Sequence, residues 1–151
     1  MTLYLGLMSG TSMDGIDAAL LEIDDAGMRL LSAVCRDWPP ALQRRLRRLA
    51  EDYQHIGLVE LGQLDTSAAK EFAQAAEQLL RANELPARAV RAVGSHGQTV
   101  LHQPEGEAPF TLQIGDPNMG AAIATVMFFI ILAGVCVYLF AIQRRMTRYA
   151  F

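Results

Sequence analysis

The amino-terminal third of the chain alternates between short apolar runs and turn-forming residues. Apolar runs occupy residues 3–8, 16–23 and 28–35, and the breaks between them contain Gly, Ser, Thr and Asp. Runs of this length that end at turn residues predict β-strands. Because the connections are too short for a crossover, we expect these three strands to form an antiparallel meander.

Helical periodicity begins after a Pro-Pro pair that ends the extended stretch. We predict one helix over residues 41–53 and a second over residues 58–83, followed by further strands at residues 90–94 and 110–114. The second helix places its apolar residues on one face: Leu58, Leu61, Leu64, Ala68, Phe72, Ala75 and Leu79. The order βββ-α-α-β-β predicts an α/β domain with a mixed sheet.

The pattern changes after residue 118. Residues 119–142 contain no charged side chain, and Arg144, Arg145 and Arg148 follow them. A helix that spans a bilayer needs about 20 apolar residues, so we predict a transmembrane-type helix with its carboxyl end in the cytoplasm. A buried core helix is the alternative, but few stay uncharged for so long. The predicted parts are thus residues 1–118, an apolar helix at 119–143 and a basic tail at 144–151.

The distribution of charged residues also differs between the part before residue 119 and the part after it. All sixteen acidic residues and ten of the thirteen basic ones precede residue 119, so the first part is acidic. An acidic domain argues against binding to nucleic acid, which favours a basic face. The basic run at residues 44–48 has helical spacing and is predicted to be a solvated helix face. Cys35 and Cys136 have no partner at metal or redox spacing and are predicted to be small buried side chains.

Residues 10–17, called here the 10–17 loop, have the composition of a phosphate-binding turn. Glycines let backbone N–H groups approach an anion, and hydroxyls add donors. Asp14 and Asp17 are predicted to hold Mg²⁺, which takes one or two carboxylates beside phosphates. An ordinary turn is the alternative. The loop is neither a Walker A nor a Rossmann motif, because it has no Lys and precedes a strand. Its members are Gly10, Thr11, Ser12, Met13, Asp14, Gly15, Ile16 and Asp17.

Three blocks in order resemble one family. GLMSGTSMDGID at residues 6–17 closely resembles the amino terminus of anhydro-N-acetylmuramic acid kinases. GSHGQT at residues 94–99 and TLQIGDPN at residues 111–118 resemble two further segments of that family. The resemblance implies a lobe of the actin, Hsp70 and sugar-kinase type, which is ribonuclease H-like. It also implies a cytoplasmic bacterial enzyme of cell-wall recycling. Such an enzyme uses ATP and Mg²⁺ to open 1,6-anhydro-N-acetylmuramic acid with water and form N-acetylmuramic acid 6-phosphate.

The resemblance also implies roles for individual residues. The 10–17 loop would bind ATP, with Asp14 and Asp17 at the metal. A polar turn at the end of a strand would face the sugar and contribute Ser95, His96, Gly97 and Gln98. His102 would support this turn, and Asp116 would be a turn residue.

Members of this family are more than twice as long as this chain and have a second lobe. The general base lies downstream of the third block, so the resemblance implies a truncated lobe that binds nucleotide without turnover. Residues 119–151 loosely resemble the last transmembrane helix of a carbohydrate ABC-transporter permease, which suggests a chimera. The alternative function is a membrane-anchored, transport-associated subunit that binds a nucleotide or sugar without catalysis. In either case residues 119–143 predict association with the inner membrane and its lipid bilayer.

Overall fold

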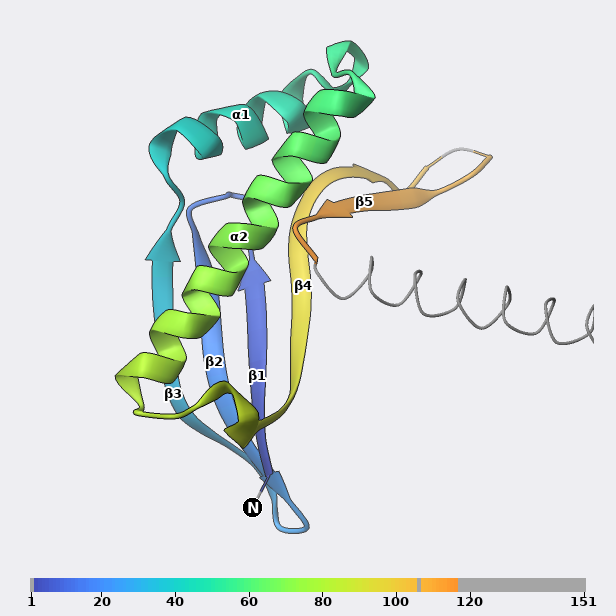
Figure 1. Cartoon of the computed structure of the whole chain (residues 1–151). Helices are drawn as coiled ribbons and strands as arrows, with labels where there is room; N and C mark the ends of the chain where they lie inside the picture. The colour runs from blue at the N-terminus through green and yellow to red at the C-terminus, as the bar shows by residue number, and fades with distance from the viewer. Residues whose placement is uncertain (1, 106, 117–151) are drawn as a thin grey trace, which may run out of the picture. The chain divides into compact units, whose positions relative to one another are not determined.

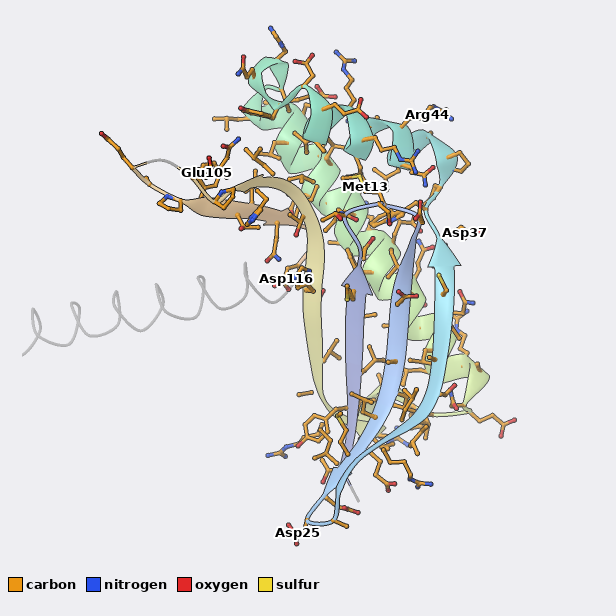
Figure 2. All side chains as sticks on the ribbon, turned by 180° about the vertical axis from the view of Figure 1, so that it is seen from behind. Met13, Asp25, Asp37, Arg44, Glu105 and Asp116 are labelled. Carbon is orange, nitrogen blue, oxygen red and sulfur yellow. The ribbon has the colours of Figure 1, made fainter. Side chains whose placement is uncertain are left out.

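A computed structural model describes residues 2–105 and 107–116, which belong to one compact unit. In this part of the chain two helices cover one face of a five-stranded sheet, and the other face carries neither of them (Figure 1, Figure 2). The elements are β1 Thr2–Ser9, β2 Gly15–Asp24, β3 Gly27–Asp37, α1 Pro40–Glu51, α2 Leu58–Ala82, β4 Val90–Gln103 and β5 Phe110–Ile114, with short 3₁₀ turns at Tyr53–His55 and Ala87–Ala89. The predicted order of elements is confirmed.

The strand order in the sheet is β3-β2-β1-β4-β5. β1, β2 and β3 form the predicted antiparallel meander, since only short turns join them. β4 runs parallel to β1, and the connection between β3 and β4 contains both helices, which gives the chain the length that a parallel pairing requires. β5 returns antiparallel to β4. The mixed sheet predicted from the sequence is confirmed.

The core lies between α2 and the covered face of the sheet. Phe72 on α2 is fully buried and meets the indole of Trp38 edge to face, with ring centroids 5.6 Å apart. Leu58 is 86 % exposed, so the predicted apolar face is wrong at its first residue, whereas the partly buried Leu61 packs against the core as predicted. The first turn of α2 extends beyond the ends of the strands (Figure 1). The buried residues of α2 are Leu64, Ala68, Phe72, Ala75 and Leu79.

Helix α1 confirms the interpretation of the basic run. Leu42, Leu46 and Leu49 face the core, and the four arginines between them are exposed. The helix ends at Glu51, two residues before the predicted end, because the chain tightens into the Tyr53–His55 3₁₀ turn.

Two predictions about β3 and β4 are wrong. Cys35 is exposed because β3 is an edge strand and this residue lies on the face away from the helices. β4 does not end at Gly94 but continues to Gln103. β4 pairs with β1 as far as Gln98 and with β5 from Gln98 onward, so Gln98 itself is paired with both Ser9 and Ile114.

Within the described residues, none of the helices has the length and apolar character needed to span a membrane. The predicted apolar helix at residues 119–143 and the basic tail lie outside the described residues.

Candidate functional site

The 10–17 loop joins the ends of β1 and β2, and buried hydrogen bonds close its base. Ser9 is 2 % exposed, and its Oγ donates to the carbonyl of Gly15 at 2.7 Å. The same Oγ accepts a hydrogen bond from Nε1 of Trp38 at 3.1 Å. Because Trp38 is itself packed against Phe72, the base of the loop is tied to the core.

The carbonyl groups of the loop are held by the protein. The Gly10 carbonyl accepts from the N–H of Met13 at 3.0 Å and from Nε2 of Gln98 at 3.1 Å. The Met13 carbonyl accepts from Nε2 of Gln43 on α1 at 2.7 Å. Met13 has a positive φ of 56°, which non-glycine residues rarely adopt, yet its side chain is buried beside α1 (Figure 2). These contacts over-determine a strained turn.

The N–H groups of the turn have a different environment. Among the described residues, the backbone N–H groups of Thr11, Ser12 and Asp14 have no hydrogen-bond acceptor. All three residues are exposed. Unpaired N–H groups that lie close together in a tight turn can form a concave site for an anion. A shallow hollow of about 400 Å³ adjoins them, lined by Thr11, Ser12, Met13, Arg47, Ala50 and Glu51.

The two predicted metal ligands have different neighbours. Asp14 has a side chain that is 76 % exposed and lies 3.5 Å from Nη2 of Arg47 on α1. Asp17 lies on β2 opposite Cys35, and its hydrogen bond with that thiol raises the pKa of Cys35. Slight burial and the charges of Asp17 and Asp37 raise this pKa further. One carboxylate therefore faces α1 and the other β3.

The exposed Asp14 fits a magnesium ion that is held mainly by phosphate oxygens. The described residues contain no group of three or more His, Cys, Asp or Glu side chains that could hold a metal. Mg²⁺ typically keeps several waters and takes one or two protein carboxylates together with phosphate oxygens. The exposed carboxylate of Asp14 next to the unpaired N–H groups meets that requirement.

The four residues predicted to bind sugar lie within β4 and are not grouped in a turn at its end. Ser95 is half-buried and its Oγ accepts a hydrogen bond from the N–H of Gly97 at 3.2 Å. His96 is exposed, and Nε2 of Gln113 lies 3.1 Å from its Nε2. Gln98 is fully buried below the 10–17 loop. The structure thus leaves His96 accessible and Ser95 partly accessible, and places Gln98 in the interior.

Sequence reasoning missed several residues that hold the site together. Trp38 and Gln43 anchor the 10–17 loop from the chain segment after β3, and no local pattern distinguishes them. Arg47, one of the four arginines assigned to a solvated face, also lies 3.4 Å from the Ser12 carbonyl. Asp65 on α2 accepts the N–H of Gly115 at 2.8 Å and so fixes the turn after β5.

The histidine assigned a supporting role does contact a neighbouring strand. Nδ1 of His102 lies 2.8 Å from Oγ1 of Thr111 on β5. Asp116, expected to be a turn residue, directly follows Gly115, whose φ is +74°.

Comparison with known proteins places these features in one family. The family model for anhydro-N-acetylmuramic acid kinase matches residues 2–131, which extends beyond residue 118. Proteins named anhydro-N-acetylmuramic acid kinase from Xanthomonas campestris pv. campestris (strain 8004), Vibrio parahaemolyticus and Xylella fastidiosa are 45 %, 45 % and 42 % identical to this chain. The alignments cover 77 %, 78 % and 82 % of this chain and 32 %, 31 % and 33 % of those relatives. The chain therefore spans about a third of the length of the curated relatives it matches.

Proposed function

The chain belongs to the anhydro-N-acetylmuramic acid kinase family, and from that premise we propose that its described part is the phosphate-binding side of such an enzyme. The 10–17 loop takes the phosphates of ATP. The observation that carries this proposal is the arrangement of the turn, in which protein donors hold the carbonyls of Gly10 and Met13 while the N–H groups of Thr11, Ser12 and Asp14 remain available.

This arrangement suits phosphoryl transfer, which depends mainly on positioning and on stabilising charge. The available N–H groups and the hydroxyls of Thr11 and Ser12 would orient the phosphate oxygens. Asp14 would hold Mg²⁺, which supplies positive charge against the phosphates. Asp17 remains a second candidate ligand, since a carboxylate that accepts one hydrogen bond from Cys35 still has free lone pairs.

For the sugar we propose the accessible part of β4. The side chain of His96 is polar and exposed, that of Ser95 is polar and half-buried, and Gln113 of β5 lies beside His96. The substrate would be the 1,6-anhydro-N-acetylmuramic acid of the relatives, and the product N-acetylmuramic acid 6-phosphate. The reaction would belong to cell-wall recycling in the cytoplasm.

For these 151 residues we propose nucleotide binding without turnover. Opening the anhydro ring with water requires a general base within hydrogen-bond reach of that water. The roles assigned above to the described residues are those of binding groups. A coupled assay of the full chain with ATP and the anhydro-sugar should therefore give no product above background, and clear turnover would contradict this part of the proposal.

Binding itself is tested by titrating ATP into the full chain labelled with ¹⁵N. We expect weak, Mg²⁺-dependent binding with chemical-shift changes at the amides of Thr11, Ser12 and Asp14. The amides of Asp24 and Gly27, in the β2–β3 turn, serve as the internal control and should not move. Shifts confined to residues outside the 10–17 loop would refute the phosphate assignment.

A second candidate function rests on the uncharged run at residues 119–142. It is a membrane-anchored subunit, associated with transport and resembling part of a permease, that binds nucleotide or sugar without catalysis. A reporter active only in the cytoplasm, fused after Phe151, should work for the apolar segment expressed alone. Recovery of the full chain in the soluble fraction, with no signal in membranes, would exclude this candidate.

A further inference from the structure

We infer that Gln98 is a positioning residue that orients the 10–17 loop, and that it does not contact the sugar. Its side chain is fully buried in the described structure, and its Nε2 lies 3.1 Å from the Gly10 carbonyl and 2.9 Å from the Thr99 carbonyl. An amide group that lies between two carbonyl oxygens must present its NH₂ side to them, so the orientation is unambiguous. Both N–H donors are then used within the protein. The inference concerns loop geometry, and only its consequence for ligand binding rests on the proposed function.

A β-bulge brings Gln98 to this position. Leu7 of β1 pairs with Ser95, but the next pair is Ser9 with Gln98, so two residues of β4 lie opposite the single residue between Leu7 and Ser9. Side chains alternate between the faces of a sheet, so an extra residue reverses the faces beyond it. Without the bulge Gln98 would lie on the face opposite to Ser95. With it, Gln98 lies on the buried face beneath the loop.

Gly97 makes the bulge possible. Its φ is +66°, a conformation that side-chain-bearing residues rarely adopt. A Cβ at this position would also lie 2.8 Å from the carbonyl oxygen of Ile114 in β5. The glycine that suggested a turn in the sequence is therefore the residue that lets β4 continue with an altered register.

Packing alone does not explain an amide at this site. Oε1 of Gln98 is buried and has no hydrogen-bond partner among the described residues. A leucine would occupy similar space without an unpaired acceptor, and unpaired buried acceptors destabilise a fold. The group that only the amide provides here is the pair of N–H donors, and one of them reaches Gly10 across 88 residues of sequence.

Because the peptide bond is planar, the contact of Gln98 with the Gly10 carbonyl also affects the anion-binding side of the loop. The carbonyl of Gly10 and the N–H of Thr11 belong to one rigid, trans peptide unit and point in opposite directions. When Gln98 and the Met13 N–H hold the carbonyl inward, the Thr11 N–H must point outward. Gln98 therefore helps to determine the direction of a donor that it does not touch.

The test uses the full chain with two replacements, Gln98→Leu and the matched control Gln103→Leu, which lies further along the same strand. Without ligand, Gln98→Leu should shift the amide resonance of Thr11 and speed the hydrogen exchange of the Met13 amide by roughly three- to tenfold. Affinity for tripolyphosphate should fall by a similar factor, while the urea midpoint changes little. Gln103→Leu should leave the Thr11 and Met13 signals and the affinity unchanged. A purely structural role would lower the midpoint and leave the loop signals of the folded protein unaltered.

Wild-type protein provides a measurement that does not depend on how the variants fold. The two side-chain amide protons of Gln98 are buried and hydrogen-bonded. They should therefore exchange far more slowly than those of the exposed Gln113. Exchange as fast as that of Gln113, or Thr11 and Met13 signals unchanged in folded Gln98→Leu, would overturn the inference. If wild-type chain fails to bind tripolyphosphate while Gln98→Leu still alters the loop signals, the positioning role stands and the proposed phosphate function fails.

Discussion

Replacing Ser9 with alanine tests how the base of the 10–17 loop is stabilised. The Ser9 hydroxyl is buried, donates to the Gly15 carbonyl at 2.7 Å and accepts from Nε1 of Trp38 at 3.1 Å. Alanine removes both hydrogen bonds and leaves the indole N–H in the core without an acceptor. It also frees the two ends of the loop from each other.

The magnitude follows from these two contacts. A buried donor left unpaired destabilises a protein by about 1–3 kcal/mol, and the loss of an ordinary hydrogen bond by about 1 kcal/mol. The Gly15 carbonyl has a second lone pair, so we assign it the smaller figure. The free energy of unfolding should fall by about 2–4 kcal/mol in total, a large fraction of the 5–15 kcal/mol typical of a domain.

Urea unfolding followed by tryptophan fluorescence measures this change directly, because Trp38 is the only tryptophan in the chain. For an m-value of about 2 kcal/mol per M, the midpoint should fall by about 1–2 M. The matched control is Ser67→Ala on α2, whose hydroxyl bonds only to a carbonyl of its own helix. That control should shift the midpoint by no more than about 0.3 M, since alanine favours helix slightly.

A double-mutant cycle isolates the contact between Ser9 and Trp38. Trp38→Phe removes the indole donor and keeps an aromatic ring near Phe72. Because that background lacks the only tryptophan, all four proteins of the cycle are unfolded in urea and followed by circular dichroism. In the Trp38→Phe background Ser9→Ala should cost about 1 kcal/mol less than in the wild type. If the two changes are additive, or if Ser9→Ala behaves like the Ser67→Ala control, the argument for a buried hydrogen-bonded base is refuted.

Three further predictions address other parts of the site. Gly115→Ala should lower the free energy of unfolding, measured in a urea titration, by at least about 2 kcal/mol, because φ is +74° and a new Cβ would lie 2.8 Å from the Cβ of Ala68. A smaller loss would mean that α2 moves to make room for the methyl group. Asp17→Asn should speed alkylation of Cys35 near pH 8, in a chain whose other cysteine is serine, by roughly two- to tenfold. The reason is that Asp17 raises the pKa of the Cys35 thiol, so less of the reactive thiolate is present at any pH below that raised pKa. An unchanged alkylation rate would contradict this role of Asp17. Asp14→Ala should abolish the Mg²⁺-dependent part of ATP binding, measured by calorimetry, and spare the Mg²⁺-free part.

Most of the fold could be predicted because its signals are local. The strand ends coincide with turn residues, and β5 begins and ends at the predicted residues. The antiparallel meander followed from the short connections, and the mixed sheet from the order of the elements. The parallel pairing of β1 with β4 was seen only in the structure. The blocks that carry the family resemblance are also continuous in sequence, so the family could be recognised without coordinates.

The errors arose where distant residues decide the outcome. Local chemistry in the Ser95–Thr99 segment favours a turn, but the segment pairs with β1 up to Gln98 and with β5 from Gln98 onward, so the chain stays extended. Cys35 is apolar enough for a core, yet its strand lies at the sheet edge. Leu58 continues a helical stripe whose first turn has no sheet beneath it (Figure 1).

By itself, the sequence determined the composition of the 10–17 loop, the order of the elements and the family, because each depends on residues that are neighbours in the chain. Tertiary structure alone decided which of the predicted site residues face solvent and which support the loop. Gln98 became a buried support because a bulge in β4 changed its face, and Trp38 and Gln43 became loop anchors because α1 and its entry pack against the β1–β2 turn. A hydrogen bond between residues far apart in sequence depends on the packed fold, and no local pattern encodes it.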